Sequence, residues 1–386
     1  VDITAGGAIE IAGENITIDD AAGVGVQAIN LTANGTINRI GGGDNYHGDF
    51  GVTLLAIDNI EIKGTNTTIT STTGGFLAEA NFDFSLVPNP ELLAIPEAVA
   101  DEDGAYTNNG DVVVTAGSGG IEITAVDGIT LNNNAADWIH AEADGSAAPA
   151  EGFVSVNANA VLESETPDPD DPAHGSSYSI QLDGTGALTI NAGAHLDADR
   201  ADDGAPGDIG LGSGTTATIA GGIGTDSDDA TFQEATDVII GDADGTTSLN
   251  TPNAITFNAG RISALDQVDM LATDGIIDIS SPGVGGTAID AEFSNGAGAA
   301  IRITSSGALG SIQFDDDGDV ISPTDNGDIV VSALGAISTT AAFTGDIKTL
   351  GGDGNIDFDA TATGSGITFD GSGTITTTGD GDITID

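Results

Sequence analysis

The sequence predicts an all-β protein folded as a parallel β-solenoid, with about 19 residues per coil and loops inserted between coils. Three observations support this prediction. Short strand-like units recur through all 386 residues, isoleucine recurs at a regular spacing, and helical periodicity is almost absent. An antiparallel meander, folded as a sandwich or barrel, is the alternative for short strands at this spacing. The repeat persists without a change in composition, which favours the solenoid.

The repeated unit reads Gly-polar-Ile-polar-apolar. It occurs as GAIEI at 7–11, GDIVV at 327–331, GNIDF at 354–358 and GDITI at 381–385. Alternation within each unit places its two apolar residues on one face of a short strand. Gly, Asn and Asp between the units tolerate the backbone angles that tight turns require. The pattern therefore predicts thin strands, each followed directly by a turn.

Two interleaved isoleucine series give the predicted length of a coil. Their members recur at intervals of about 19 residues near the C-terminus: Ile329, Ile347 and Ile367, and Ile337, Ile356 and Ile375. Residues of one type that recur once per coil would stack into layers of a narrow core. The sequence leaves open whether a coil has two faces or three.

Proline-rich and acidic segments interrupt this repeat. Proline cannot donate to a strand ladder, so we expect these segments to be loops extruded from the coil. The predicted organisation is a solenoid over 1–75, an extruded insertion over 76–109 and a continued solenoid over 110–386, with further loops near 133–150, 164–178 and 198–207.

The C-terminal repeats resemble those of known exported proteins. The segment 354–386, GNIDFDATATGSGITFDGSGTITTTGDGDITID, is similar to the passenger repeats of filamentous-haemagglutinin-like adhesins and of autotransporters. This resemblance implies a right-handed β-helix that is secreted and displayed on a cell surface for adhesion or matrix building. The chain is far more acidic than such repeats.

The charge balance excludes several classes of partner. The chain contains six Lys and Arg and 61 Asp and Glu, which gives a net charge of −55. It contains no cysteine. Nucleic-acid binding and attachment to anionic lipid both require clustered cations. Disulfide frameworks and zinc–thiolate sites require cysteine. We therefore expect no nucleic-acid partner, and the absence of a long apolar run predicts no membrane insertion.

Such a charge must be offset by cations from solution. If it were spread along a stack of coils, its density would be comparable to that of duplex DNA, with one charge per ~1.7 Å. Two interpretations remain open. The environment is rich in salt and screens the charge, or the chain binds Ca²⁺ specifically through carboxylates.

The acidic turns supply candidate Ca²⁺ ligands. The best cluster surrounds Gly318, where four carboxylates could converge on one ion. The clusters near 101–104 and 242–245 are weaker versions. The predicted metal ligands are Asp315, Asp316, Asp317 and Asp319, then Asp242 and Asp244, and Asp101 and Asp103. A solvated acidic turn is the alternative for each cluster.

The predicted function is structural or adhesive. We expect an extracellular, Ca²⁺-stabilised protein that is a surface adhesin segment or a subunit of a filament, sheath or layer. Its partners would be copies of itself, adjoining repeats of a longer chain, or surface glycans. We expect no catalysis, because cationic side chains are scarce and Asp is too abundant for a carboxylate pair to be informative. The alternative is a carbohydrate-active enzyme or glycan-binding module on the same scaffold.

Overall fold

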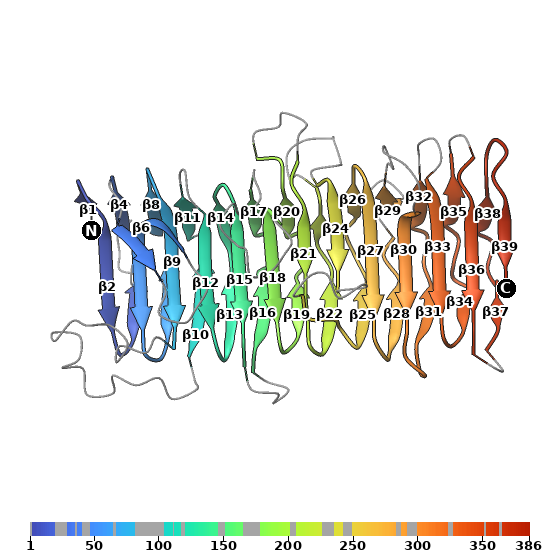
Figure 1. Cartoon of the computed structure of the whole chain (residues 1–386), viewed down its shortest axis with the longest axis horizontal. Helices are drawn as coiled ribbons and strands as arrows, with labels where there is room; N and C mark the ends of the chain where they lie inside the picture. The colour runs from blue at the N-terminus through green and yellow to red at the C-terminus, as the bar shows by residue number, and fades with distance from the viewer. Residues whose placement is uncertain are drawn as a thin grey trace. The chain divides into compact units, whose positions relative to one another are not determined.

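The structure is a computed structural model of the whole chain, divided into an N-terminal unit, Val1–Ala187, and a C-terminal unit, Leu188–Asp386 (Figure 1). It describes residues 2–19, 29–34, 37–40, 47–64, 67–81, 104–110, 112–116, 120–145, 151–164, 178–200, 206–225, 235–241, 249–282, 287–291, 299–322, 327–350, 353–362 and 365–386. Within these residues all regular structure is β-strand. No helix there is long and apolar enough to cross a membrane.

Each coil contributes one strand to each of three parallel sheets, here named A, B and C. In the N-terminal unit, sheet A contains β1 (Asp2–Ala5), β4 (Ile29–Ala33), β8 (Thr67–Ser71), β11 (Val113–Ala116), β14 (Asn133–Ala135) and β17 (Val161–Glu163). Sheet B contains β2 (Ile9–Gly13), β6 (His47–Ala56), β9 (Gly75–Ala80), β12 (Ile121–Ala125), β15 (Ile139–Ala143) and β18 (Ile180–Gly184). Sheet C contains β3 (Ile16–Asp19), β7 (Ile60–Gly64), β10 (Ala105–Gly110), β13 (Gly128–Leu131) and β16 (Phe153–Val156). Strand β5 (Ile37–Ile40) lies outside this pattern and pairs antiparallel with β6.

The C-terminal unit repeats the same arrangement. Its sheet A contains β20 (His195–Asp197), β23 (Gly222–Ile223), β26 (Ile262–Ala264), β29 (Thr287–Ala291), β32 (Asp319–Ser322), β35 (Asp346–Thr349) and β38 (Thr374–Thr376). Sheet B contains β21 (Ile209–Leu211), β24 (Asp237–Ile240), β27 (Gln267–Ala272), β30 (Ala299–Ser305), β33 (Asp328–Ala333), β36 (Ile356–Ala360) and β39 (Ile383–Ile385). Sheet C contains β19 (Leu188–Ile190), β22 (Thr216–Ile219), β25 (Ala254–Phe257), β28 (Ile276–Ile279), β31 (Ser311–Phe314), β34 (Ile337–Thr339) and β37 (Ile367–Thr368).

These sheets confirm the predicted right-handed parallel β-solenoid and show that its coil has three faces (Figure 1). The alternation predicted from the sequence is visible in strand burial. In β33, for example, Ile329, Val331 and Ala333 are buried, whereas the intervening side chains are partly exposed. The sheets thus enclose a thin, mainly aliphatic core with a few buried aromatic rings, and leave one polar row of side chains per strand on the outside.

The predicted coil of about 19 residues is too short for the C-terminal repeats. Ile329 pairs with Ile356, and Ile356 pairs with Ile383, at a separation of 27 residues in each case. The residues of the first predicted series lie in three different sheets, because Ile329 is in β33, Ile347 in β35 and Ile367 in β37. The 19-residue spacing therefore measures two strands with their turns, and the third face lengthens the coil.

Some predicted insertion boundaries also need correction. Within the segment predicted as an insertion, 76–109, the two ends belong to strands β9 and β10, while 82–103 lie outside the described residues. Within the predicted loop 133–150, β14 and β15 continue the coil up to Ala143. The apolar repeat is broken there because Asn134 occupies a buried position that Val114 and Leu162 fill on the neighbouring strands. Much of 164–178 and 198–207 lies outside the described residues.

Candidate functional site

The outer face of sheet C in the N-terminal unit carries a grid of polar side chains over three strands. The middle row is formed by Thr17 on β3, Glu61 on β7 and Thr107 on β10, which are register partners. The next row along the strands contains Asp19, Lys63 and Asn109. These residues point outward because their neighbours Ile16, Ile60 and Tyr106 are buried in the core.

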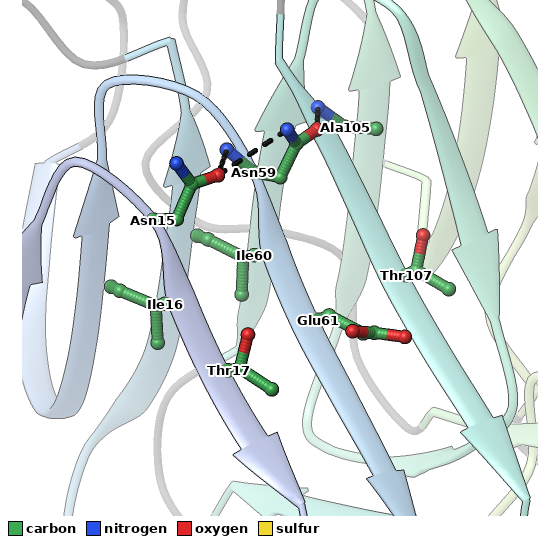
Figure 2. Close-up of a pocket in the computed structure, with 8 residues that line it drawn as sticks. All are labelled: Asn15, Ile16, Thr17, Asn59, Ile60, Glu61, Ala105 and Thr107. Atoms are coloured by element: carbon green, nitrogen blue, oxygen red, sulfur yellow. Dashed lines mark hydrogen bonds between the residues drawn. The ribbon is translucent and has the colours of Figure 1, made fainter.

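A depression with a volume of about 430 Å³ lies on this grid (Figure 2). It is lined by Asn15, Ile16, Thr17, Asn59, Ile60, Glu61, Ala105 and Thr107. Ala105 contributes only a methyl group to this lining, and its register partner on β13 is Gly128. Hydroxyl and carboxylate groups from neighbouring strands thus meet at one open site.

An asparagine ladder fixes the rim of this depression (Figure 2). Asn15 Oδ1 accepts hydrogen bonds from the backbone N–H of Asn59 at 3.2 Å and from its side-chain Nδ2 at 3.4 Å. Asn59 Oδ1 in turn accepts from the backbone N–H of Ala105 at 3.0 Å. Asn15 Nδ2 donates to Asp58 at 2.7 Å. These bonds satisfy turn donors of successive coils and hold the rim in one conformation.

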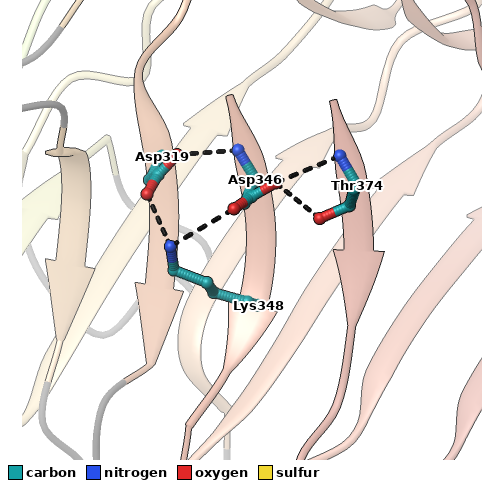
Figure 3. A network of polar contacts seen from close by, with 4 residues as sticks. All are labelled: Asp319, Asp346, Lys348 and Thr374. Atoms are coloured by element: carbon teal, nitrogen blue, oxygen red, sulfur yellow. Dashed lines mark hydrogen bonds and ion pairs between the residues drawn. The ribbon is translucent and has the colours of Figure 1, made fainter. Parts of the chain in front are cut away.

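A second polar network lies on sheet A of the C-terminal unit (Figure 3). Lys348 Nζ lies 2.6 Å from Asp319 Oδ2 and 3.5 Å from Asp346 Oδ2. Asp319 Oδ1 accepts from the backbone N–H of Asp346 at 2.7 Å, and Asp346 Oδ1 accepts from the backbone N–H of Thr374 at 3.2 Å. One lysine therefore bridges two acidic residues within a ladder that spans three coils.

The charges in this network shift one another's protonation. The hydroxyl of Thr374, followed by the ammonium group of Lys348, lowers the pKa of Asp346. Burial opposes the charge of Lys348, but hydrogen bonds and ion pairs with Asp319 and Asp346 outweigh it and raise the pKa of the ammonium group. Both partners are thus held in their charged forms at neutral pH.

Other cationic side chains bridge neighbouring coils in the same way. Arg261 Nε and Nη2 each lie 2.7 Å from a carboxylate oxygen of Asp290, forming a bidentate pair. Arg302 Nη1 lies 2.8 Å from Asp269 Oδ2. Lys63 Nζ lies 2.9 Å from Glu61 and 3.6 Å from Asp19. Each of these cations, like Lys348, is therefore paired with an acidic residue on a neighbouring coil.

A further acidic ladder in the C-terminal unit involves Asp208 and Asp237. Asp208 Oδ1 accepts a hydrogen bond from the backbone N–H of Asp237 at 3.2 Å. Burial, followed by the charges of Asp208 and Asp266, raises the pKa of Asp237 to about 7. Burial also raises the pKa of Asp208. This ladder differs from that of Asp346, because nearby acids favour the protonated form here.

His140 joins two carboxylates on sheet B of the N-terminal unit. Its Nδ1 lies 3.4 Å from Glu122 Oε2, and its Nε2 lies 3.9 Å from Glu142 Oε2. Glu122 and His140 are register partners on β12 and β15, and both are buried although they occupy outward positions. A protonated imidazole would add another ionic link between coils.

The predicted metal ligands around Gly318 are divided between a turn and the start of a strand. Asp315, Asp316 and Asp317 lie on the turn between β31 and β32, and Asp319 begins β32. Asp315 Oδ1 accepts hydrogen bonds from the backbone of Asp316 at 2.8 Å and from Thr340 Oγ1 at 2.6 Å. Asp319 is engaged by Lys348 instead. Calcium at this turn therefore stays a prediction.

The other predicted ligands, Asp101, Asp103, Asp242 and Asp244, lie outside the described residues. In the part of the chain that the structure describes, no group of three His, Cys, Asp or Glu side chains is placed to hold a metal ion. The sequence prediction missed the roles of Glu61, Lys63 and Lys348. Their signal was a rare lysine at an outward strand position, two residues after an acidic residue.

Comparison with protein families, characterised proteins and solved structures found no significant match.

Proposed function

We propose that this chain is an extracellular protein with a structural or adhesive role, displayed on a cell surface or built into a filament, sheath or layer. The observation that carries the proposal is the use of the outer faces. Aligned acidic and hydroxyl side chains occupy them, and four of the six Lys and Arg, namely Lys63, Arg261, Arg302 and Lys348, form ion pairs between coils. A large hydrated surface on a repeated scaffold suits contact with other macromolecules.

The charge imbalance supports a role for bound cations in this function. The chain has 61 acidic residues and six Lys and Arg. Most carboxylates must therefore be balanced by ions from solution. Ca²⁺ is the candidate cofactor, since it accepts carboxylate and carbonyl oxygens in variable geometry and is abundant outside cells. Self-association, or packing against adjoining repeats, would follow from the same scaffold.

An attachment assay tests the proposal. Beads coated with the purified chain would be passed over cultured cells and over extracellular polymers in Ca²⁺, with albumin-coated beads as the control. Electron microscopy of the free protein under the same conditions would reveal filaments or layers. The proposal predicts attachment above the control or ordered assemblies. Attachment no better than that of albumin, together with dispersed monomers at every protein concentration, would overturn it.

A further inference from the structure

We propose that the depression on the outer face of sheet C in the N-terminal unit binds a neutral glycan, with Thr17, Glu61 and Thr107 as its contact residues. This inference rests on the proposed adhesive function and names a ligand class for it. Glu61 stands between Thr17 and Thr107 in one register row, and all three residues line an open hollow (Figure 2).

The row has a spacing and a chemistry that suit a sugar. Adjacent strands of a sheet lie about 4.8 Å apart, so the three side chains present polar groups at a regular short interval. A carboxylate accepts hydrogen bonds through two oxygens, and a threonine hydroxyl both donates and accepts. Neighbouring hydroxyls of a sugar ring can donate to Glu61 while they accept from Thr17 or Thr107. Charge-assisted hydrogen bonds of this kind are the stronger ones.

The carboxylate of Glu61 is held in place before any ligand arrives. Lys63 Nζ lies 2.9 Å from Glu61 Oε2 and 3.6 Å from Oδ2 of Asp19 on the neighbouring strand. The ladder through Asn15, Asn59 and Ala105 fixes the adjoining rim. A ligand would therefore not have to order the Glu61 side chain or the rim, which lowers the entropic cost of binding.

The negative charge of the chain favours a neutral glycan over an anionic one. A chain with a net charge of −55 repels anionic polysaccharides. Lys63 already provides Glu61 with a cationic partner, so a neutral ligand requires no further charge compensation. The lining residues include no aromatic ring for stacking, so we expect a weak single contact. Display of many copies on one surface would raise the overall avidity.

The test is a binding measurement with defined neutral oligosaccharides. Gluco-, manno-, galacto- and chito-oligosaccharides would be titrated into the whole chain by calorimetry and printed on an array, with oligogalacturonate as an anionic control. The variants Thr17→Val and Thr107→Val keep side-chain shape and remove the hydroxyl, and Glu61→Gln keeps the shape and removes the charge. Thr130→Val is the matched control, because Thr130 is the register neighbour of Thr107 on β13 and does not line the depression.

We expect at least one neutral oligosaccharide to bind the wild type, and the affinity to fall by about tenfold in Glu61→Gln and to be unchanged in Thr130→Val. Circular dichroism would confirm that each variant is folded. The inference fails if no neutral oligosaccharide binds below about 10 mM, or if all four variants bind like the wild type. Attachment of coated beads without oligosaccharide binding would overturn the glycan site alone and leave the adhesive function standing.

Discussion

Ile329 and Ile356 are direct register partners on adjacent coils of the C-terminal unit, and both side chains are fully buried. The next member of this column is Ile383, which is 43% exposed. The column therefore contains chemically identical side chains in two environments, which allows the stability of the core to be measured with an internal control.

Truncation in this column should destabilise the protein according to burial. We expect Ile356→Ala to lower the free energy of unfolding by about 2–5 kcal/mol, because it leaves a cavity between two packed coils. Ile383→Ala should cost much less, since less of its surface is removed from water. Urea unfolding followed by circular dichroism measures both values. Equal losses for the two variants would contradict the layered core.

Removal of the lysine at the acidic ladder of sheet A should also be costly. Lys348→Met would leave Asp319 and Asp346 facing each other without their shared cation. We expect a loss of about 1.5–3 kcal/mol, the range for hydrogen bonds to charged groups. Lys63→Met is the matched control and should lose less, because the Lys63 side chain is 37% exposed and that of Lys348 only 19%. A larger loss for Lys63→Met would show that burial does not govern these bridges.

Asp237 should give stability a dependence on pH that is opposite to that of a salt-bridged acid. Its folded pKa of about 7 lies above the ordinary 3.8, so between these values the folded state binds the proton more tightly than the unfolded state. Its contribution is then greatest at low pH and is lost as the pH rises through about 7. We expect Asp237→Asn to be more stable than the wild type at pH 8 and to differ little at pH 4.

Urea unfolding at pH 4 to 8 measures this difference, and comparison of variant with wild type removes the general effect of the other acids. Asp346→Asn is the control, because the pKa of Asp346 is lowered and its contribution is lost as the pH falls. A wild type more stable than Asp237→Asn at pH 8 would contradict the assignment.

Calcium should be distinguishable from simple screening by thermal unfolding in Ca²⁺, in EDTA, and in EDTA with NaCl at matched ionic strength. A specific site present at 100 times its dissociation constant adds about 2.7 kcal/mol. We expect Ca²⁺ to raise the midpoint beyond NaCl, and Asp315→Asn with Asp317→Asn to reduce that gain. Asp380→Asn, on another exposed turn, is the control. Equal effects of Ca²⁺ and NaCl would assign the acidity to salt adaptation.

The alternation of buried and outward side chains within each strand was predictable from the sequence, but the number of residues per coil was not. Alternation around residues such as Ile329 and Val331 predicts which side chains enter the core, because a strand has a period of two. The spacing from Ile329 to Ile347 cannot tell whether the two residues are stacked or lie on different faces. That distinction depends on how many turns close one coil, and turns such as Gly335 and Gly345 look alike in sequence.

The candidate site was harder to predict, because it depends on register between distant segments. Thr17, Glu61 and Thr107 are far apart in the chain and become neighbours only when coils stack. The same holds for Lys348 and Asp319. Clusters contiguous in sequence, such as that around Gly318, attract attention first, but among the described residues no three of these carboxylates are placed to hold a metal ion.

Chain length between register partners varies widely while the pairing stays parallel. Only 18 residues separate Ile121 from Ile139, whereas 45 separate Thr68 from Val113. Closing a longer loop costs entropy that grows only with the logarithm of its length. A corner of the coil can therefore gain or lose a peptide while the strands on either side keep their partners. Proteins that descend from one such scaffold could therefore acquire different segments at the corners of the coil while they keep the same stacked strands.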